Sequence, residues 1–242
     1  MKKKPSKAFK DWQYEEVEQA FGLTRFRTLP FIESLKKISL PKNHIQRPTL
    51  EKYRLELFDY IDTWNEDEYK FLFIGPYFKL IDFTTPYFKV FTQRPMSVNY
   101  ENDTLTTSGK VEFMLAKGKQ IPQKPHFFLH EYKPEKNRDN DPLGQLLIAM
   151  VAAQKINQDT KPIYGVYVNG RNWFIVVLEE QKYAVRNPYV VTSDDIFDLF
   201  AVLECMKVIM ETMYKELAQS SLHHNPQFSE TQQQRFFTRR TK

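Results

Sequence analysis

The chain has 242 residues, of which 41% are hydrophobic and 15% aromatic, so it can bury a substantial core and is not globally disordered. Its net charge of +5 permits a polyanionic partner without requiring one, and its single cysteine excludes a disulfide framework and a cysteine-based zinc site. The most apolar stretch, GQLLIAMVAA, is too short to span a bilayer, and no secretory signal is evident. We therefore expect a soluble, cytoplasmic protein that does not insert into membranes.

The N-terminal part of the sequence predicts helices. Residues 1–10 form a basic lead that we expect to be flexible. A helical period follows, with Asp11 as the expected N-cap and Gly22 as the expected stop. We interpret residues 11–84 as a helical front section of one domain that spans 11–219.

Two further helices are expected within this front section. Apolar residues recur at three- and four-residue spacing over residues 49–64, as in an amphipathic helix. Asn65 and Glu68 have the spacing of a capping box, which predicts the start of the next helix. The Gly75-Pro76 pair should break or kink that helix.

Residues 85–219 are predicted to form an α/β core. The stretch YFKVFTQRPMSVNYE is rich in aromatic and β-branched residues, and its proline indicates an edge strand or a bulge. The stretch GKVEFMLAKGKQIPQKPHFFLHEYK predicts two strands joined by a polar turn. Together they give three consecutive strands.

A helix, two strands and a long closing helix complete the expected core. Asp141 is the predicted N-cap of the first of these helices, with Pro142 at its first position. Asn169-Gly170 marks a hairpin turn between the two strands. The closing helix is expected to begin near Thr192, and residues 220–242 have the composition of a disordered tail. This order of elements predicts a mixed α/β fold.

Charged residues at the ends of the predicted strands form a candidate site. Glu131 and Lys133 share a strand face, because alternate side chains point to the same side. In the preceding strand, alternation places Glu112 and Met114 on one side and Val111, Phe113 and Leu115 on the other. If the two strands are neighbours, Glu112 can meet Glu131 across the ladder. Two carboxylates at such a short distance repel each other unless a cation lies between them. Mg²⁺ and Mn²⁺ prefer oxygen ligands of this kind.

This arrangement resembles the PD-(D/E)XK nuclease superfamily. The matching pattern is an acid on one strand (Glu112), Glu-x-Lys on the next (Glu131-Tyr132-Lys133) and a glutamine on the following helix (Gln145). The resemblance covers roughly residues 105–190. It is nearest to small uncharacterised bacterial members and more distant from the nuclease domain of type I restriction subunits.

The sequence departs from the family pattern at two places. Val111-Glu112 stands where the family usually has Pro-Asp, so the acid is one methylene longer. Ala149 stands where a tyrosine is expected after the glutamine. Glu-x-Lys is a weak signal alone. The preceding acid strand and the capped helix that follows make the combined pattern moderately specific.

The resemblance implies a restriction-endonuclease-like mixed sheet flanked by helices, and it assigns roles to the matching residues. Glu112 and Glu131 would hold Mg²⁺ or Mn²⁺, with the carbonyl oxygen of Tyr132 as a third ligand. Lys133 would deprotonate or position the attacking water. Gln145 would steady the site or the substrate.

The family pattern often adds an acid from the first helix, and Glu16 is the candidate here. A helical projection places it within the broad apolar arc that contains Trp12 and Val17, whereas Glu15 and Glu18 fall outside that arc. A buried carboxylate without a partner is costly, which favours a partner for Glu16.

The expected function is that of a metal-dependent nuclease that binds and cleaves DNA or RNA, with DNA as the first choice and a homodimer possible. The alternative is a catalytically inactive module of the same fold that binds nucleic acid or a protein partner. A third hypothesis is a structural domain unrelated to nucleases. Under the simpler interpretations, Glu131 and Lys133 form a solvated strand end, Glu112 is a hairpin surface residue and Gln145 is a solvated helix position.

Overall fold

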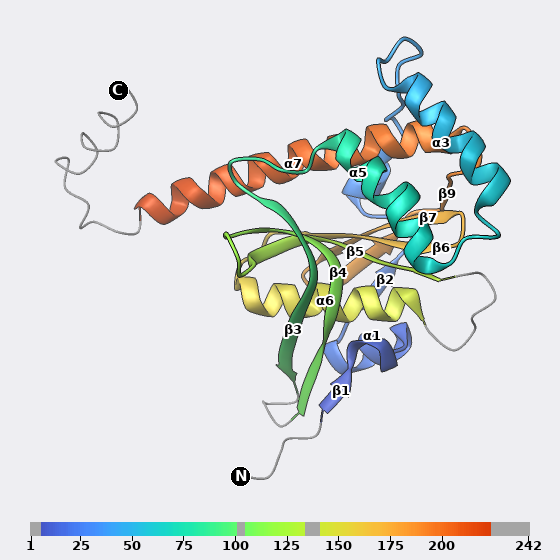
Figure 1. The fold of residues 1–242 in the computed structure, drawn as a ribbon. Coiled ribbons are helices and arrows are strands. Elements are labelled where there is room, and N and C mark those ends of the chain that lie inside the picture. Colours follow the sequence, from blue (N-terminus) through green and yellow to red (C-terminus); the bar gives the residue numbers. More distant parts are fainter. Residues whose placement is uncertain (1–5, 101–104, 134–140, 224–242) are drawn as a thin grey trace.

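The computed structural model describes residues 6–100, 105–133 and 141–223, and these residues form one mixed, nine-stranded sheet with helices on both faces (Figure 1). The main path through the sheet runs β1-β4-β5-β6-β7-β8-β2, with β3 beside β4 and β9 beside β7. The strands are β1 (Ser6–Ala8), β2 (Thr24–Phe26), β3 (Lys89–Tyr100), β4 (Leu105–Lys117), β5 (Gln123–Lys133), β6 (Ile163–Asn169), β7 (Asn172–Glu179), β8 (Lys182–Val185) and β9 (Tyr189–Val190).

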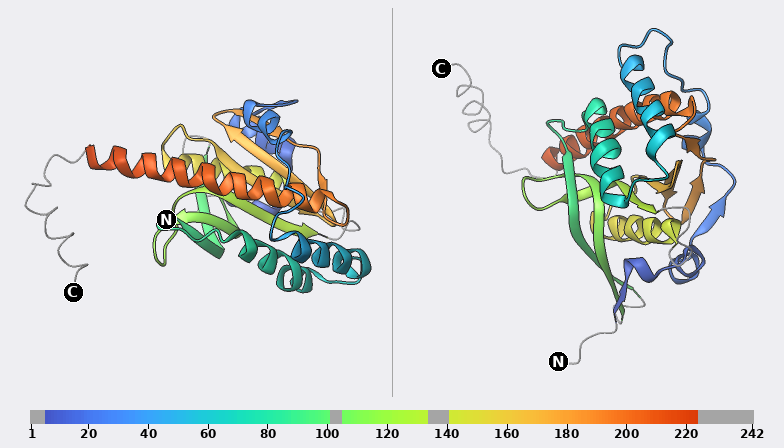
Figure 2. Two further views of the ribbon diagram at one scale, coloured as in Figure 1. Left: turned by 90° about the horizontal axis from the view of Figure 1, so that it is seen from above. Right: turned by 45° about the vertical axis from the view of Figure 1, so that its right-hand side comes forward.

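The helices divide between the two faces of the sheet. A large aromatic core joins one face to α2, α3, α5 and α7, while a second core joins the other face to α1 and α6. Figure 2 shows α6 on the opposite side of the sheet from α5 and α7. The helical segments are η1 (Phe9–Asp11), α1 (Tyr14–Phe21), α2 (Pro30–Leu35), α3 (Arg47–Tyr60), α4 (Glu66–Tyr69), η2 (Lys70–Ile74), α5 (Gly75–Ile81), α6 (Pro142–Asn157) and α7 (Asp195–His223).

The centre of the sheet is a three-stranded meander followed by a helical crossover. Strand β4 pairs antiparallel with both β3 and β5, as expected for three consecutive strands. Helix α6 then crosses one face of the sheet, and β6 returns parallel to β5. The Asp141 side chain accepts a hydrogen bond from the Leu143 N–H, and Pro142 occupies the first turn, so the predicted start of α6 is confirmed.

The N-terminal section differs from the prediction in three short segments. Strands β1 and β2 join the sheet, and η1 forms a 3₁₀ turn before the first α-helix. Ser6–Ala8 pairs with β4, so the predicted flexible lead is partly ordered. The first α-helix begins at Tyr14 with Gln13 as its N-cap, and Asp11 belongs to the preceding 3₁₀ turn. Gly22 ends the helix as expected, with φ of 66°. Strand β2 pairs parallel with β8, so the front section is not purely helical.

The Gly75-Pro76 pair changes the helix without breaking it. The capping box of Asn65 and Glu68 is confirmed, since each residue's side chain accepts a hydrogen bond from the other's backbone N–H. The helix then passes through a π-helical turn, η2, where the Gly75 N–H donates to the Lys70 carbonyl. Pro76 has no N–H to donate, and the wider turn accommodates it.

Helix α7 begins at Asp195, slightly after the expected start near Thr192, and runs across the molecule, with its C-terminal end extending past the sheet (Figures 1 and 2). It continues to His223, beyond the predicted boundary at residue 219; the rest of the predicted tail lies outside the described residues. Within the described part of the chain, no helix combines the length and apolar character needed to cross a membrane.

Candidate metal and nucleic-acid site

Glu112 lies at a point in β4 where the regular alternation of side chains between the two faces of the sheet is interrupted. Val111 and Met114 pack into the core beside α6, whereas Phe113 packs into the opposite core. Simple alternation would have placed Val111 with Phe113, so that part of the prediction is wrong. In the facing strand, Gln93 has a left-handed backbone with φ of 52°. As a result, Glu112 and its neighbour Phe113 line the same cavity.

The Glu112 carboxylate is paired with Lys70, which the sequence analysis did not single out. The Lys70 Nζ donates to Glu112 Oε1 at 2.7 Å and also to the Glu66 carboxylate. Burial alone would lower the pKa of Lys70, but its hydrogen bonds to Glu112 and Glu66 outweigh that effect and leave the pKa raised. Lys70 is therefore a cation, and it balances the charge of a Glu112 side chain that is only 15% exposed.

A cavity of about 350 Å³ lies between α5 and strands β3 and β4, with the Lys70–Glu112 pair in its wall. Its apolar wall includes three aromatic rings. The ring centres of Phe78 and Phe113 are 4.7 Å apart, and those of Phe78 and Phe83 are 5.3 Å apart. Glu112 is therefore not a hairpin surface residue, because its carboxylate lies beside a largely apolar hollow.

The backbones of Glu131 and Lys133 are placed beside this region, while their side chains lie outside the described part of the structure. Strand β5 pairs directly with β4, with Leu129 opposite Phe113, so the expected adjacency of the two strands is confirmed. The pairing of β5 with β6 shifts by one residue between His130 and Tyr132. Glu131 is thus at a β-bulge, a feature that redirects side chains and is frequent beside active sites.

Gln145 occupies the first turn of α6 and is only 2% exposed, so the interpretation of a solvated helix position is wrong. Its Nε2 atom makes no hydrogen bond to any described residue. A buried amide left without a partner is costly, which suits a group that binds a ligand or a water molecule. The sequence signal for this burial was the almost unbroken apolar character of α6.

The structure places Glu16 outside the core, contrary to the helical projection. Its side chain is 47% exposed, and the buried residue of α1 is its neighbour Val17. The Glu16 carboxylate accepts hydrogen bonds from the Gln13 N–H at 2.9 Å and the Lys7 Nζ at 2.8 Å. The backbone hydrogen bond first, and then Lys7, lower the pKa of Glu16. Glu16 is therefore a capping residue, which accounts for its position three residues after the N-cap.

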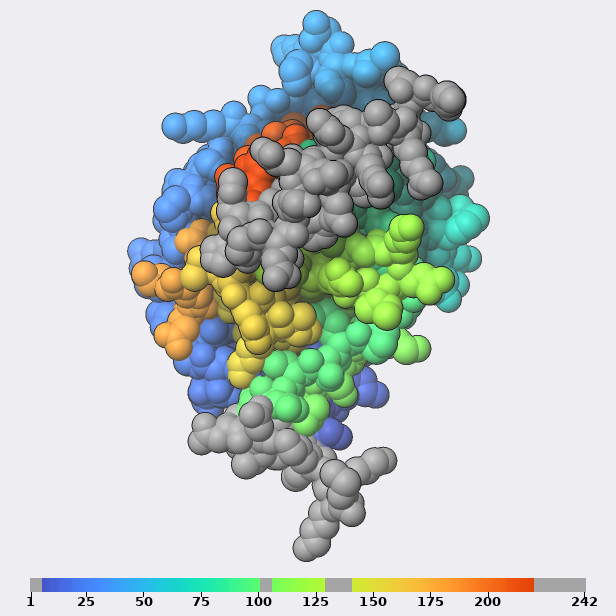
Figure 3. Space-filling model, turned by 90° about the vertical axis from the view of Figure 1, so that its left-hand side faces the viewer, coloured from blue at the N-terminus to red at the C-terminus, as the bar shows by residue number. Residues whose placement is uncertain are grey.

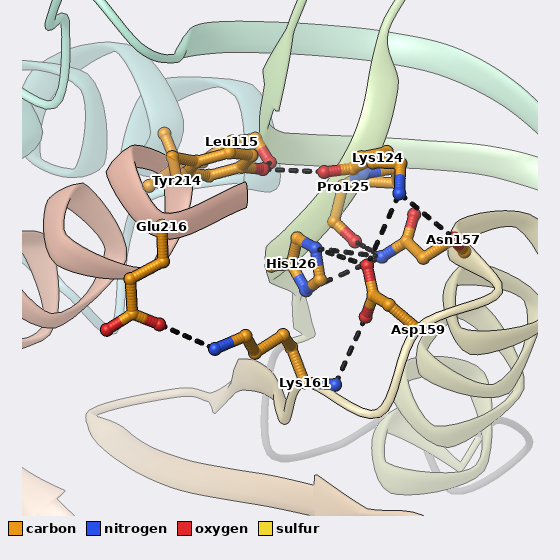
Figure 4. Close-up of polar contacts among 9 residues, drawn as sticks. All are labelled: Leu115, Lys124, Pro125, His126, Asn157, Asp159, Lys161, Tyr214 and Glu216. Atoms are coloured by element: carbon orange, nitrogen blue, oxygen red, sulfur yellow. Dashed lines mark hydrogen bonds and ion pairs between the residues drawn. The ribbon is translucent and has the colours of Figure 1, made fainter. Parts of the chain in front are cut away.

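A second polar cluster lies near the start of β5 and the end of α6 (Figure 4). His126 is fully buried, with its Nε2 atom 3.6 Å from Asp159 Oδ2. Asn157 donates to the Pro125 carbonyl at 2.7 Å, and Tyr214 of α7 donates to the Lys124 carbonyl at 2.6 Å. These contacts tie together β5, α6 and α7.

This cluster is distinct from the candidate site. Glu131 and Gln145 lie at the other ends of β5 and α6. Figure 3 shows the end of α6, in yellow, beside the β4–β5 turn, in yellow-green, and Lys124 near that turn donates to the Asn157 carbonyl. Burial lowers the pKa of His126 to about 4, although the Asp159 carboxylate opposes the shift. A neutral, enclosed imidazole indicates a packing role.

Within residues 6–100, 106–128 and 141–219, no three histidine, cysteine, aspartate or glutamate side chains group closely enough to hold a metal ion. Glu131 is not among these residues. The sequence matches no protein-family model, and no curated protein is significantly similar to it.

Proposed function

We propose that the protein is a metal-dependent nuclease of the PD-(D/E)XK type. The observation that carries the proposal is the position of Glu112. Its carboxylate lines a cavity on β4, next to the strand whose bulge contains Glu131. Acids on two adjacent strands can supply oxygen ligands to one cation, and bulges are frequent beside active sites.

The order of the central elements supports the same proposal. The resemblance implies an acid-bearing strand, a Glu-x-Lys strand and a helix with a glutamine in a mixed sheet, and β4, β5 and α6 follow one another in that order. The crossover helix carries Gln145 in its first turn, at the end of α6 that follows β5 in the chain. The order of these elements and the position of Gln145 support both the proposed fold and the proposed nuclease function.

The donor set fits a hard divalent cation. Glu112 supplies carboxylate oxygens, and Glu131 and the Tyr132 carbonyl belong to the neighbouring strand. When bound, Mg²⁺ or Mn²⁺ would polarise the phosphodiester and lower the pKa of an attacking water. Lys70 already supplies one positive charge at Glu112, so it would balance the carboxylate when the site is not loaded.

Besides the proposed metal ligands, two further side chains have proposed roles in catalysis. Lys133 would orient the attacking water or accept its proton, as the resemblance implies. Gln145 does not line the Glu112 cavity, since α6 covers the other face of the sheet, and its buried amide would steady a water molecule or a part of the substrate that reaches the start of α6. Glu16 is assigned no catalytic role, because its carboxylate is committed to the start of α1.

A cleavage assay with defined substrates tests this function. Plasmid, linear duplex, single-stranded DNA and RNA are incubated with Mg²⁺ or Mn²⁺, and with EDTA instead. We expect metal-dependent cleavage of at least one substrate, and we expect Glu112→Gln or Lys133→Ala to slow it by about 10²–10⁴-fold. Glu16→Gln is the matched control and should retain activity. Activity that survives both substitutions would locate the chemistry elsewhere.

One observation favours the alternative of an inactive nucleic-acid-binding module. Glu112 Oε1 is already paired with Lys70 at 2.7 Å, an arrangement that can serve stability alone. This alternative predicts no cleavage of any substrate, together with binding that weakens as the salt concentration rises.

A further inference from the structure

We infer that the cavity beside Glu112 receives one unpaired base of a nucleic-acid strand, so that the substrate class is single-stranded or splayed nucleic acid. This inference rests on the proposed function and adds a substrate preference to it. The cavity volume of about 350 Å³ is at the small end of ligand pockets, which range over about 300–1,000 Å³. It therefore suits one ring-shaped group, and a helix or a folded peptide would not fit.

The chemistry of the cavity wall matches a nucleobase. Phe78, Phe83 and Phe113 present a cluster of aromatic rings, all of them anchored in the core. Aromatic side chains contribute to the binding of unstacked bases in many nucleic-acid-binding proteins, largely without regard to sequence. Because the rings are held by packing, the cavity is formed before any ligand binds.

Polar groups at the rim complete the match. Thr84 and Thr92 line the cavity, and so does Gln93, which offers an amide donor and acceptor. The left-handed backbone at Gln93 is part of the irregularity that turns this section of β3 toward the cavity. Such groups can hydrogen-bond to the edge of a base, whereas a purely hydrocarbon ligand would leave them without partners.

Glu112 connects the cavity to the proposed chemistry. The same side chain lines the cavity and supplies the proposed metal ligand, so a phosphate bound there brings its own nucleotide to the cavity mouth. In a duplex, that base is paired and stacked, and moving it into a pocket costs unstacking energy. A single strand or a frayed end avoids this cost, which gives the predicted preference.

Filling the cavity tests the inference. Thr92 is exposed in β3 and lines the cavity, so Thr92→Trp should block it without removing a core side chain. Ser97→Trp adds the same side chain at an exposed position of the same strand, outside this cavity, and is the matched control. Binding of a short fluorescent single strand is measured with Ca²⁺ in place of Mg²⁺, to prevent cleavage. A parallel series of oligonucleotides lacks one base at each position in turn.

We expect Thr92→Trp to weaken single-strand binding roughly 5- to 150-fold, the range that corresponds to the loss of one stacked base. Ser97→Trp should bind like the unmodified protein. Removal of the base at one position of the oligonucleotide should weaken its binding to the unmodified protein by a similar factor. It should leave the affinity of Thr92→Trp almost unchanged, because that variant no longer accommodates the base.

The possible outcomes distinguish failure of this inference from failure of the proposed nuclease function. Metal-dependent cleavage with equal preference for duplex and single strand, unaffected by Thr92→Trp, would overturn the cavity's role and leave the nuclease proposal standing. No binding or cleavage of any nucleic acid would overturn both. Equal losses in Thr92→Trp and Ser97→Trp would indicate a general effect on β3 and would also overturn the inference.

Discussion

At the scale of single residues, the Lys70–Glu112 ion pair is the main polar contact described at the candidate site. Glu112 could be selected from the sequence because it precedes a Glu-x-Lys strand. Lys70 could not, because its approach depends on a π-helical turn 42 positions earlier in the chain. Glu16 shows the converse error. A helical projection describes which face is apolar, but a capping box turns the third residue back toward the helix start.

Lys70→Met should destabilise the protein by about 1–3 kcal/mol without metal, because Glu112 keeps its charge but loses a charge-assisted hydrogen bond. Added Mg²⁺ should restore more stability to this variant than it adds to the unmodified protein, since the bound cation replaces the missing ammonium. Denaturant unfolding with and without Mg²⁺ measures both effects.

The matched control for this prediction is Lys79→Met. Lys79 also lines the cavity, but it is largely exposed and its Nζ is 3.8 Å from Asp82. This variant should be nearly neutral. If Lys70→Met matches the unmodified protein in stability and in its response to Mg²⁺, the charge-balancing role is wrong.

At the scale of elements, α5 and strands β3, β4 and β5 position the Glu112 cavity and Glu131, whereas α6 positions Gln145 on the other face of the sheet. The cap at Asp141 and the three strands before it could be predicted, because capping and turn chemistry are local. The face switch at Glu112 and the bulge at Glu131 could not, because the first depends on the left-handed backbone of Gln93 in the facing strand and the second on a register shift between β5 and β6. Short strands such as β1 and β2 were missed because three residues carry too little periodicity.

Gly144→Ala tests how tightly α6 is held against the N-terminal segment. A Cβ atom at Gly144 would lie 2.3 Å from the Trp12 carbonyl oxygen and 2.7 Å from the Tyr14 backbone nitrogen. Helix propensity alone predicts a gain of about 1 kcal/mol for alanine, whereas a backbone clash predicts a loss of about 1–3 kcal/mol. We expect the loss, measured by thermal or denaturant unfolding, and a more stable variant would contradict this packing.

At the scale of the whole molecule, the buried polar cluster around His126 joins the sheet to α6 and α7. It lies away from the candidate site and is relevant to global stability. The mixed α/β class followed from the order of predicted elements, and a mixed sheet flanked by helices was what the family resemblance implied. The division into two cores did not, because it depends on which helix covers which face.

The His126 environment predicts a loss of stability in mild acid. Its pKa of about 4 in the folded protein lies below the ordinary value of 6.5, so the unfolded chain takes up the proton first. Stability should therefore fall as the pH drops from about 6.5 to about 4, by on the order of 3 kcal/mol from this group. Denaturant unfolding across this range, compared with His126→Gln, isolates the contribution. An unchanged pH dependence in the variant would contradict the assignment.

The central claim is that Glu112 and Glu131 share one divalent cation, and Mn²⁺ binding tests it most directly. Electron paramagnetic resonance or titration calorimetry counts bound Mn²⁺ for the unmodified protein and for Glu112→Gln, Glu131→Gln and Glu16→Gln. We predict one specific ion, lost when either Glu112 or Glu131 is changed and retained in Glu16→Gln. Retention of that ion in both Glu112→Gln and Glu131→Gln, or no specific binding by the unmodified protein, would contradict the account.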